Sequence, residues 1–197
     1  MAGDTIPLPS LFYADSMSVG QAINQRRSIR NFTDEALELD DVGKLIYPAY
    51  GISDTLYGFH TAPSAGALFP MDIYLHAENV KDLKSGIYRY IPDTHGLINI
   101  SGGSYSSDIK AICNNQSCVG KAQLNIIICA DFDRTTSKYG QRGISYVFQE
   151  SGHIGQNIYL QATALGLGTV AIGAFDNEAM QKLLHTDSMP IYILYVG

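Results

Sequence analysis

Cationic side chains gather in the stretch 23–32, INQRRSIRNF, of a chain whose formal net charge is −6. Arg26, Arg27, Ser28 and Arg30 lie within this stretch. A guanidinium group matches phosphate oxygens with two parallel charge-assisted hydrogen bonds, and a serine hydroxyl adds a third. The cluster therefore predicts a bound phosphate. The alternative is a set of solvated charges at the C-terminal end of a helix, where the macrodipole favours cations.

A second stretch, HTAPSAGALFP at 60–70, combines one hydroxyl with very small side chains. Ser64 supplies the hydroxyl, and Ala65, Gly66 and Ala67 leave no bulk above the backbone. Such a loop lets a flat ring system lie against peptide groups. Taken alone, the stretch is better explained as a surface turn that enters a strand.

A third stretch, ALGLGTVAIGAFD at 164–176, contains three glycines where a helical pattern gives way to a strand. It is not a dinucleotide-binding fingerprint, because that motif follows a strand and opens a helix. A glycine-rich helix end explains Gly166 and, less directly, Gly168. It leaves Gly173 unexplained.

Other polar side chains have ordinary structural explanations. We expect His153, which is flanked by apolar residues, to be a hydrogen-bonded core histidine. We expect Glu150 to be a structural ion-pair partner. Tyr139 and Arg142 could border a substrate pocket, but we expect both to be solvent-exposed loop residues.

The composition describes an ordinary soluble domain of 197 residues with 46% hydrophobic and 16% charged residues. The acidic balance argues against duplex nucleic acid as a partner. The three cysteines form no CxxC pair, so we expect no metal site, and Cys129 is expected to be buried. The absence of a signal peptide pattern and of a long apolar run predicts a cytoplasmic protein outside the membrane.

Hydrophobic periodicity predicts mixed helices and strands without strict alternation, hence an α+β fold. Residues 1–17 are interpreted as an N-terminal arm and 18–197 as a single domain. Ser18 and Gln21 form a capping box for a helix that ends near Arg27. A second helix should place Val42 on its buried face, begin at Asp40 or Asp41, and end early or kink at Pro48, before Gly51. The remaining predictions are strands at 71–78, 122–131 and 190–196, a hairpin at 86–100, helices at 104–112, 144–165 and 176–184, and a strand or loop at 168–175.

In the 144–165 helix, one stripe of residues at helical spacing mixes large and small side chains. It comprises Ile144, Phe148, Ser151, Gly155, Ile158, Ala162 and Leu165. Small residues along such a stripe permit another helix to approach closely, as at the centre of a dimer or of a domain core.

Four stretches in register carry a resemblance to a known family: RRSIRNF, TAPSAGALFPMDIYL, GIYRY and ESGHIGQNIYLQATALGLGTVAIGAFD. The chain resembles the nitroreductase family of FMN-dependent oxidoreductases, and more closely its SagB-type (ThcOx-like) dehydrogenase branch. The resemblance implies a three-layer α/β/α sandwich that forms an intertwined homodimer with FMN at the subunit interface. Many nitroreductases have an asparagine in the neighbourhood of Gly66 and Ala67, which instead match the SagB-like branch.

The resemblance also implies which residues hold the cofactor. Arg26, Ser28 and Arg30 would bind the phosphate and ribityl end, with Arg27 contributing mainly through its backbone. A loop of the partner subunit would lie along the flavin, and a third segment would lie behind its ring and present a backbone N–H towards N5. The loop comprises Pro63, Ser64, Ala65, Gly66 and Leu68, and the third segment Ile172, Gly173 and Ala174.

The implied activity is hydride transfer through flavin N5, from a donor such as NAD(P)H to a small organic acceptor such as a nitroaromatic or a quinone. Three alternatives remain open at this point. One is a SagB-type dehydrogenase that oxidises azoline rings in modified peptides. The others are a non-catalytic FMN-binding or storage protein and a phosphate- or nucleotide-sensing module without flavin.

Overall fold

The computed structural model describes residues 5–11, 17–116 and 118–197. Its centre is a seven-stranded sheet with the order β1-β6-β5-β4-β7-β9-β8, in which every neighbouring pair is antiparallel. A two-stranded β2–β3 sheet lies apart from it. The strands are β1 Thr5–Pro7, β2 Ile52–Asp54, β3 Phe59–His60, β4 Met71–Ala77, β5 Gly86–Ile91, β6 Gly96–Gly102, β7 Leu124–Ala130, β8 Thr169–Ile172 and β9 Met189–Val196.

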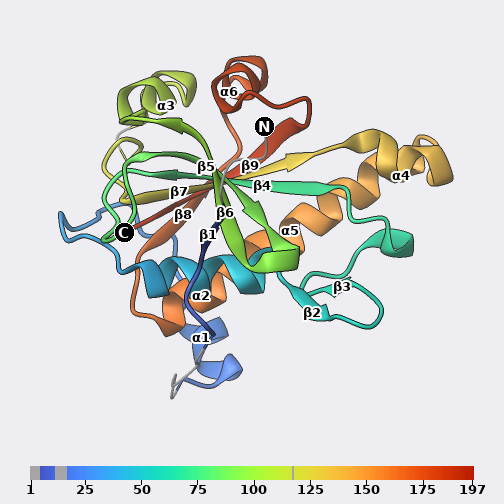
Figure 1. Cartoon of the computed structure of the whole chain (residues 1–197), viewed down its shortest axis with the longest axis horizontal. Coiled ribbons are helices and arrows are strands. Elements are labelled where there is room, and N and C mark those ends of the chain that lie inside the picture. Colours follow the sequence, from blue (N-terminus) through green and yellow to red (C-terminus); the bar gives the residue numbers. More distant parts are fainter. Residues whose placement is uncertain (1–4, 12–16, 117) are drawn as a thin grey trace.

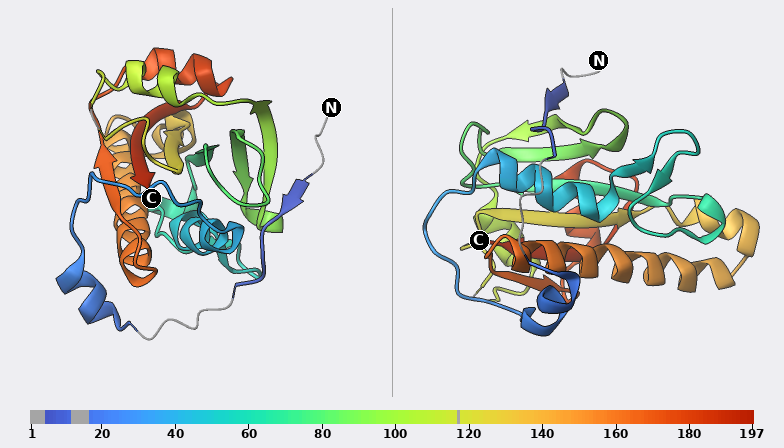
Figure 2. Two further views of the ribbon diagram at one scale, coloured as in Figure 1. Left: turned by 90° about the vertical axis from the view of Figure 1, so that its left-hand side faces the viewer. Right: turned by 90° about the horizontal axis from the view of Figure 1, so that it is seen from below.

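Helices cover both faces of the large sheet (Figure 1). Helices α3 and α6 lie on one face, and α2 and α5 lie on the other, with α1 beside them (Figures 1 and 2). The predicted three-layer α/β/α sandwich is confirmed. The helices are α1 Val19–Gln25, α2 Leu39–Tyr50, α3 Ser106–Ile112, α4 Phe132–Tyr139, α5 Arg142–Ala164 and α6 Asn177–Leu184, with short 3-10 turns η1 Ala65–Ala67 and η2 Pro92–Thr94.

Strand β7 shows why the sheet has a core on each side. All of its residues are buried. Successive side chains of a strand point to opposite faces. Accordingly Ile126 and Ile128 join the core under α2 and α5, whereas Ile127 and Cys129 join the core under α3 and α6. The prediction of a strand covered on both faces is confirmed.

Helix α1 begins as the sequence predicts. The Ser18 side chain accepts a bond from the Gln21 backbone, and the Gln21 side chain accepts one from the Ser18 backbone N–H. Arg26 is the C-cap, with φ −51° and ψ 126°, so the chain leaves the helix there. The arginine stretch is therefore extended backbone that follows a short helix.

Helix α2 confirms its predicted buried face and its predicted stop at Gly51, but not its predicted N-cap. Val42 and its companions Leu45, Ile46 and Ala49 are fully buried. The N-cap is Glu38, without a side-chain cap bond, so the prediction of Asp40 or Asp41 as cap is wrong; both lie in the first turn. The helix also continues to Tyr50, so Pro48 does not end it early.

The first turns of the long helix α5 leave part of the predicted stripe exposed in the single chain. Ile144 and Phe148 are exposed, whereas Gly143, Val147 and Glu150 are buried. The reason is α4, which the sequence patterns did not reveal. A Cβ on Gly143 would lie 3.0 Å from the backbone of Thr136 in α4, so α4 packs closely against this side of α5.

The small-residue seam of α5 receives a strand side chain. A Cβ on Gly155 would lie 2.9 Å from the ring of Tyr192 in β9. The small residue thus makes room for a tyrosine of the sheet within the same chain.

The N-terminal segment adds an edge strand. Residues Thr5–Pro7 pair with β6, with Ile6 opposite Leu97. The rest of the predicted arm lies partly outside the described residues. Within the described residues, no helix combines the length and apolarity that a membrane crossing requires.

Candidate functional site

The arginine stretch carries positive charge that no acidic side chain of the described residues neutralises. Among the ion pairs of the described residues, none involves Arg26, Arg27 or Arg30. Arg27 Nη1 donates to the carbonyl oxygens of Asn24 and Arg26, at 3.0 and 2.7 Å. The helix-end alternative therefore describes Arg27. It does not describe Arg26, whose guanidinium lies over the ring of Tyr159, 5.0 Å from its centroid.

Tyr159 joins the first predicted stretch to the third. Its hydroxyl lies 3.0 Å from Ser28 Oγ and accepts the backbone N–H of Ala171 at 2.8 Å. The N–H of Ile29 also donates to the carbonyl of Thr169 at 2.9 Å. The fold thus brings residues 26–30 against β8. The Ala171 contact lies one residue before Ile172 of the third stretch.

The glycines of the third stretch have different roles. Gly166, at φ +74°, ends α5 in a Schellman motif, because Gly166 N–H donates to Thr163 O and Leu167 N–H to Ala162 O. Gly168 allows close packing, since a Cβ there would lie 2.9 Å from Ile29. Gly173 has no atom within 4 Å of an added Cβ. Open space, not packing, surrounds Gly173, as expected of a backbone that another molecule can approach.

Ala174 follows in the same exposed turn. Its carbonyl oxygen accepts bonds from the side-chain amides of Asn114 and Gln116, at 3.3 and 3.2 Å. These bonds hold the end of the third stretch in place from the loop after α3.

The second stretch forms a strained loop beside the N-terminal half of α5. Gly66, Ala67 and Phe69 have φ values of +64°, +53° and +46°. Non-glycine residues in this region of φ are uncommon and often lie at functional sites. Ser64 helps to hold the loop, because its Oγ accepts the N–H of Phe69 at 3.0 Å. Pro63 is exposed and Leu68 half-buried.

Two side chains of α4 lie against this loop. A Cβ on Gly66 would lie 2.7 Å from the hydroxyl of Tyr139 and 2.9 Å from Nζ of Lys138. Tyr139 is half-buried in a helix, so its prediction as an exposed loop residue is wrong. Arg142 is exposed, but it begins α5 and its guanidinium lies over the ring of Tyr146.

Glu150 is also not what the sequence predicted. It is 2% exposed, and no ion pair includes it among the described residues. Its carboxylate accepts the hydroxyl of Tyr50 at 3.0 Å, and the nearby Ser64 hydroxyl also interacts with it. Burial raises the pKa of Glu150 to about 7, although the two hydroxyls lower it in part.

The prediction of His153 as a core histidine is wrong, because its side chain is exposed on the outer face of α5. Cys129 is buried as predicted, and burial raises the pKa of its thiol well above the usual range. Cys113 and Cys118 are buried as well, and all three cysteines are unpaired.

The fold unites two of the three predicted stretches and separates the third. Ser64 meets α5 at Glu150, whereas Ser28 meets it at Tyr159, nine residues later. At 1.5 Å per residue, these points lie roughly 13 Å apart along the helix. Figure 2 shows α5 running along the length of the molecule between them.

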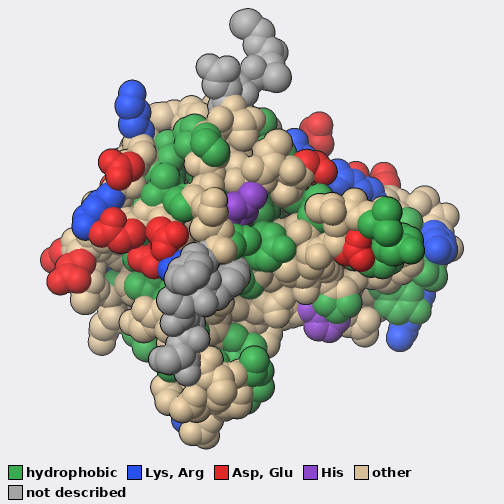
Figure 3. Space-filling model, turned by 60° about the horizontal axis from the view of Figure 1, so that its bottom comes forward, with side chains coloured by type: hydrophobic (Ala, Val, Ile, Leu, Met, Phe, Trp, Pro, Cys, Tyr) green, Lys and Arg blue, Asp and Glu red, His purple; other side chains and the backbone are tan. Residues whose placement is uncertain are grey.

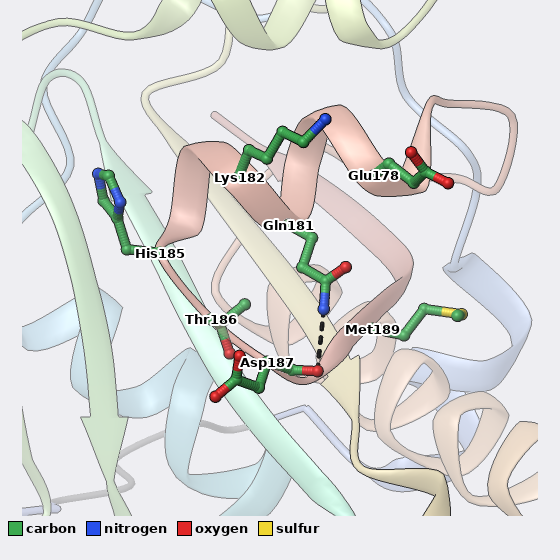
Figure 4. A pocket seen from close by; sticks show the side chains of 7 residues that line it. All are labelled: Glu178, Gln181, Lys182, His185, Thr186, Asp187 and Met189. Atoms are coloured by element: carbon green, nitrogen blue, oxygen red, sulfur yellow. Dashed lines mark hydrogen bonds between the residues drawn. The ribbon is translucent and has the colours of Figure 1, made fainter.

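The surface hollows away from these stretches are weaker candidates for a functional site. Figure 4 shows one of about 780 Å³ between α6 and the start of β9. Lys182 and Glu178, of opposite charge, line it, and Gln181 Nε2 donates to the carbonyl of Asp187 at 2.9 Å. A narrower apolar groove of about 330 Å³ lies between α1, α2 and α5. Within the described residues, no three potential metal ligands gather.

The arginine stretch fits an anionic group. Arg26 and Arg30, which form no ion pair within the described residues, precede and follow Ser28 in the chain, and the Arg26 guanidinium lies over the ring of the tyrosine that bonds to Ser28. Such a set of groups suits the oxygens of a phosphate. The open backbone at Gly173 would admit a flat group near the same place. The residues present therefore fit the phosphate end of FMN and the approach of its ring.

Sequence reasoning missed Tyr159 and Tyr50 and misassigned Glu150. For Glu150 and Tyr159, the helical spacing of apolar residues in α5 could have revealed their burial. Glu150 lies three residues after Val147 and four before Ile154, and Tyr159 lies beside Ile158, so both occur on the buried face. The prediction used Ile144 and Phe148 to set that face and therefore overlooked them.

Comparison with known proteins agrees with the geometry. Residues 23–197 match the nitroreductase family. "Putative nitroreductase MJ1384" of Methanocaldococcus jannaschii is 36% identical over 197 residues, covering 99% of this chain and 98% of that protein. The microcin B17-processing protein McbC of Escherichia coli is 26% identical over 172 residues, covering 84% of this chain and 63% of McbC.

Solved structures have the same fold. A nitroreductase-like protein of Ralstonia eutropha superposes with a TM-score of 0.85 at 25% identity, covering 98% of this chain and 88% of that chain. A Vibrio harveyi NADPH:FMN oxidoreductase complexed with NAD+ superposes with a TM-score of 0.64 at 19% identity, covering 91% of this chain and 67% of that chain. Because the family match spans most of the chain and the relative from M. jannaschii matches along its whole length, this chain belongs to the nitroreductase family.

Proposed function

We propose that the protein is an FMN-dependent oxidoreductase that takes hydride from NAD(P)H and passes it to a small organic acceptor such as a nitroaromatic or a quinone. Bound flavin would supply the hydride chemistry through N5. The chain's own residues would bind the cofactor, orient it and shape the cleft in which donor and acceptor alternate. The family and the Vibrio harveyi oxidoreductase of the same fold support this proposal.

The observation that carries the proposal is the uncompensated arginine stretch beside β8. Arg26 and Arg30 have no acidic partner in the described part of the chain, and Ser28 lies between them. In this proposal these three side chains bind the cofactor phosphate. Arg27 contributes its backbone, since its guanidinium is occupied by the carbonyls of α1.

The other two stretches would enclose the ring. Ile172, Gly173 and Ala174 would lie behind it, with a backbone N–H towards N5. The loop of Pro63, Ser64, Ala65, Gly66 and Leu68 would come from the partner subunit. The separation of Ser28 and Ser64 along α5 supports a site that two chains complete.

A homodimer also agrees with the exposed apolar side chains. Val19 and Ile23 of α1 are 70% and 56% exposed. Figure 3 shows hydrophobic side chains on the surface at the right-hand end of the molecule. Leu56, Tyr57 and Phe148 are also exposed. We expect sedimentation to show a dimer and Ile23→Glu to shift it towards monomer, because the charge would be buried at the interface. A wild-type monomer with full flavin occupancy would contradict this arrangement.

The decisive experiment identifies the cofactor. We expect the purified protein to be yellow and to release FMN, identified by its absorbance and mass. Anaerobic NAD(P)H should bleach the flavin, and a quinone or nitroaromatic should restore the colour. A colourless protein that binds no added FMN would refute the proposal, and a spectrum that no donor changes would favour a flavin-storage protein.

A second candidate is oxidation of azoline rings in modified peptides, as in SagB-type dehydrogenases. The match to the microcin B17-processing protein McbC favours it. Turnover of an azoline-containing peptide to the azole, with its two electrons passing through the flavin to added oxygen and no consumption of NAD(P)H, would establish this direction of reaction.

The three unpaired cysteines agree with a cytoplasmic location, which we also propose.

A further inference from the structure

Glu150 is a buried carboxyl group whose partners are two hydroxyls. Its side chain is packed between α5, α2 and the loop that contains Ser64, and it contacts Tyr50 and Ser64. A buried carboxylate without a cation is costly unless several donors satisfy it. The proposed hydride chemistry does not require this acid, so its place beside the cofactor loop calls for a role.

Backbone groups limit how the two hydroxyls can orient. Met71 N–H donates to the Tyr50 hydroxyl at 3.3 Å, and Phe69 N–H donates to Ser64 Oγ at 3.0 Å. Each hydroxyl thus has one lone pair occupied and one proton to donate. When Glu150 is ionised it accepts bonds only, so both hydroxyls point their protons at it. When Glu150 is neutral its own proton can bond to Ser64 Oγ, and the Ser64 proton is free to turn away.

We propose that the protonation state of Glu150 sets the direction of the Ser64 hydroxyl, which donates to a hydrogen-bond acceptor on the bound flavin ring only when Glu150 is neutral. This inference rests on the proposed function, because it takes the loop of Ser64 to lie along the flavin. Glu150 is then a positioning residue that acts through Ser64. Binding of the ring should make the protein take up a proton at Glu150.

The charged and titratable groups around Glu150 allow both its ionised and its neutral state near pH 7. Tyr50 of α2 is held neutral, since burial and the nearby Glu150 charge raise its pKa. His60 of β3 is bonded to the Tyr50 carbonyl, and burial lowers its pKa, so it is neutral above pH 7. From α4, Arg134 acts electrostatically on Tyr50, and Lys138 faces Gly66. Because burial raises the pKa of Glu150 to about 7, both of its states are accessible near neutral pH.

The test is calorimetric titration of apoprotein with FMN at pH 8, in two buffers with different ionisation enthalpies. At this pH the second ionisation of a phosphate monoester, with a pKa of about 6, is essentially complete. The wild type should take up a measurable fraction of one proton per site. Its FMN affinity should fall by up to tenfold per pH unit between pH 7 and 9. Glu150→Gln keeps an acceptor for Tyr50 but cannot ionise, so both effects should vanish.

Two further variants complete the test. Glu178→Gln, an exposed change on α6, should behave as the wild type. Ser64→Ala should lose the proton uptake while Glu150 is intact, which keeps the inference testable even if Glu150→Gln folds poorly. Wild-type binding without proton uptake, or equal uptake in Glu150→Gln or Ser64→Ala, would overturn the inference and leave the flavin site standing. Failure of every variant to bind FMN would refute the proposed function and the inference together.

Discussion

Replacing Arg26 with alanine is the sharpest test of the phosphate site. Arg26 lies where α1 ends, is half-buried, and has its guanidinium 5.0 Å from the centroid of the Tyr159 ring. This contact holds the guanidinium beside the Ser28 hydroxyl, which bonds to Tyr159 as well. The substitution removes one cation from this position and leaves the backbone in place.

The expected loss follows from the type of bond. A hydrogen bond to a charged group contributes about 1.5–3 kcal/mol. A change of about 1.4 kcal/mol corresponds to a factor of ten in affinity, so Arg26→Ala should weaken FMN binding roughly 10- to 150-fold. Arg26→Lys keeps the charge but loses the fork geometry, and should therefore fall between the wild type and Arg26→Ala.

Fluorescence titration of apoprotein with FMN and with riboflavin separates this effect from general damage. Riboflavin has no phosphate, so its affinity should hardly change in Arg26→Ala. Lys182→Ala is a control that also removes one cation, because Lys182 is on α6 and lines the hollow that lies away from the three stretches. Unchanged FMN affinity, or an equal loss for FMN and riboflavin, would refute the phosphate role of Arg26.

Three further predictions concern stability. Tyr159→Phe should lower the free energy of unfolding by about 1–3 kcal/mol in chemical denaturation, because it leaves the N–H of Ala171 without its acceptor; an unchanged value would contradict that role. Glu150 has a pKa of about 7 in the folded protein, above the value near 4.3 of an unfolded glutamate, so its contribution is present at low pH and is lost as the pH rises towards 7. Between pH 5 and 8, wild-type stability should therefore fall by roughly 2–3 kcal/mol relative to Glu150→Gln, and parallel curves would exclude the raised pKa. Gly66→Ala should destabilise by more than Gly58→Ala, because both glycines have positive φ, near +65°, but only at Gly66 would the new Cβ meet other side chains. Equal melting temperatures for these two variants would exclude a close contact with α4.

Local sequence patterns were sufficient to predict the structure wherever one hydrophobic periodicity dominated. The capping box of α1, the buried face of α2 around Val42 and the fully covered strand β7 were all predictable, because each depends on neighbours a few residues away. The same holds for the Schellman motif at Gly166, which uses bonds within one helix end.

Prediction failed where a distant element decided the outcome. The inward face of α5 at Gly143 is set by α4, which packs on it through Thr136. Glu150 was expected to form an ion pair, yet the hydroxyls that it meets come from α2 and from the loop at Ser64, 100 and 86 positions earlier in the chain.

By itself, the sequence determined the α+β fold class, most of the helices and strands, and the charge of the stretch that should bind a phosphate. Only the tertiary structure decided that Tyr159 links Ser28 to β8, that Ser64 meets α5 nine residues before the point where Ser28 meets it, and that Glu150 is buried without an ion-pair partner among the described residues. The physical reason is the range of the interactions. Helix and strand periodicity is local, whereas hydrogen-bond partners and the loss of solvent around a charge depend on segments that meet only when the chain has folded.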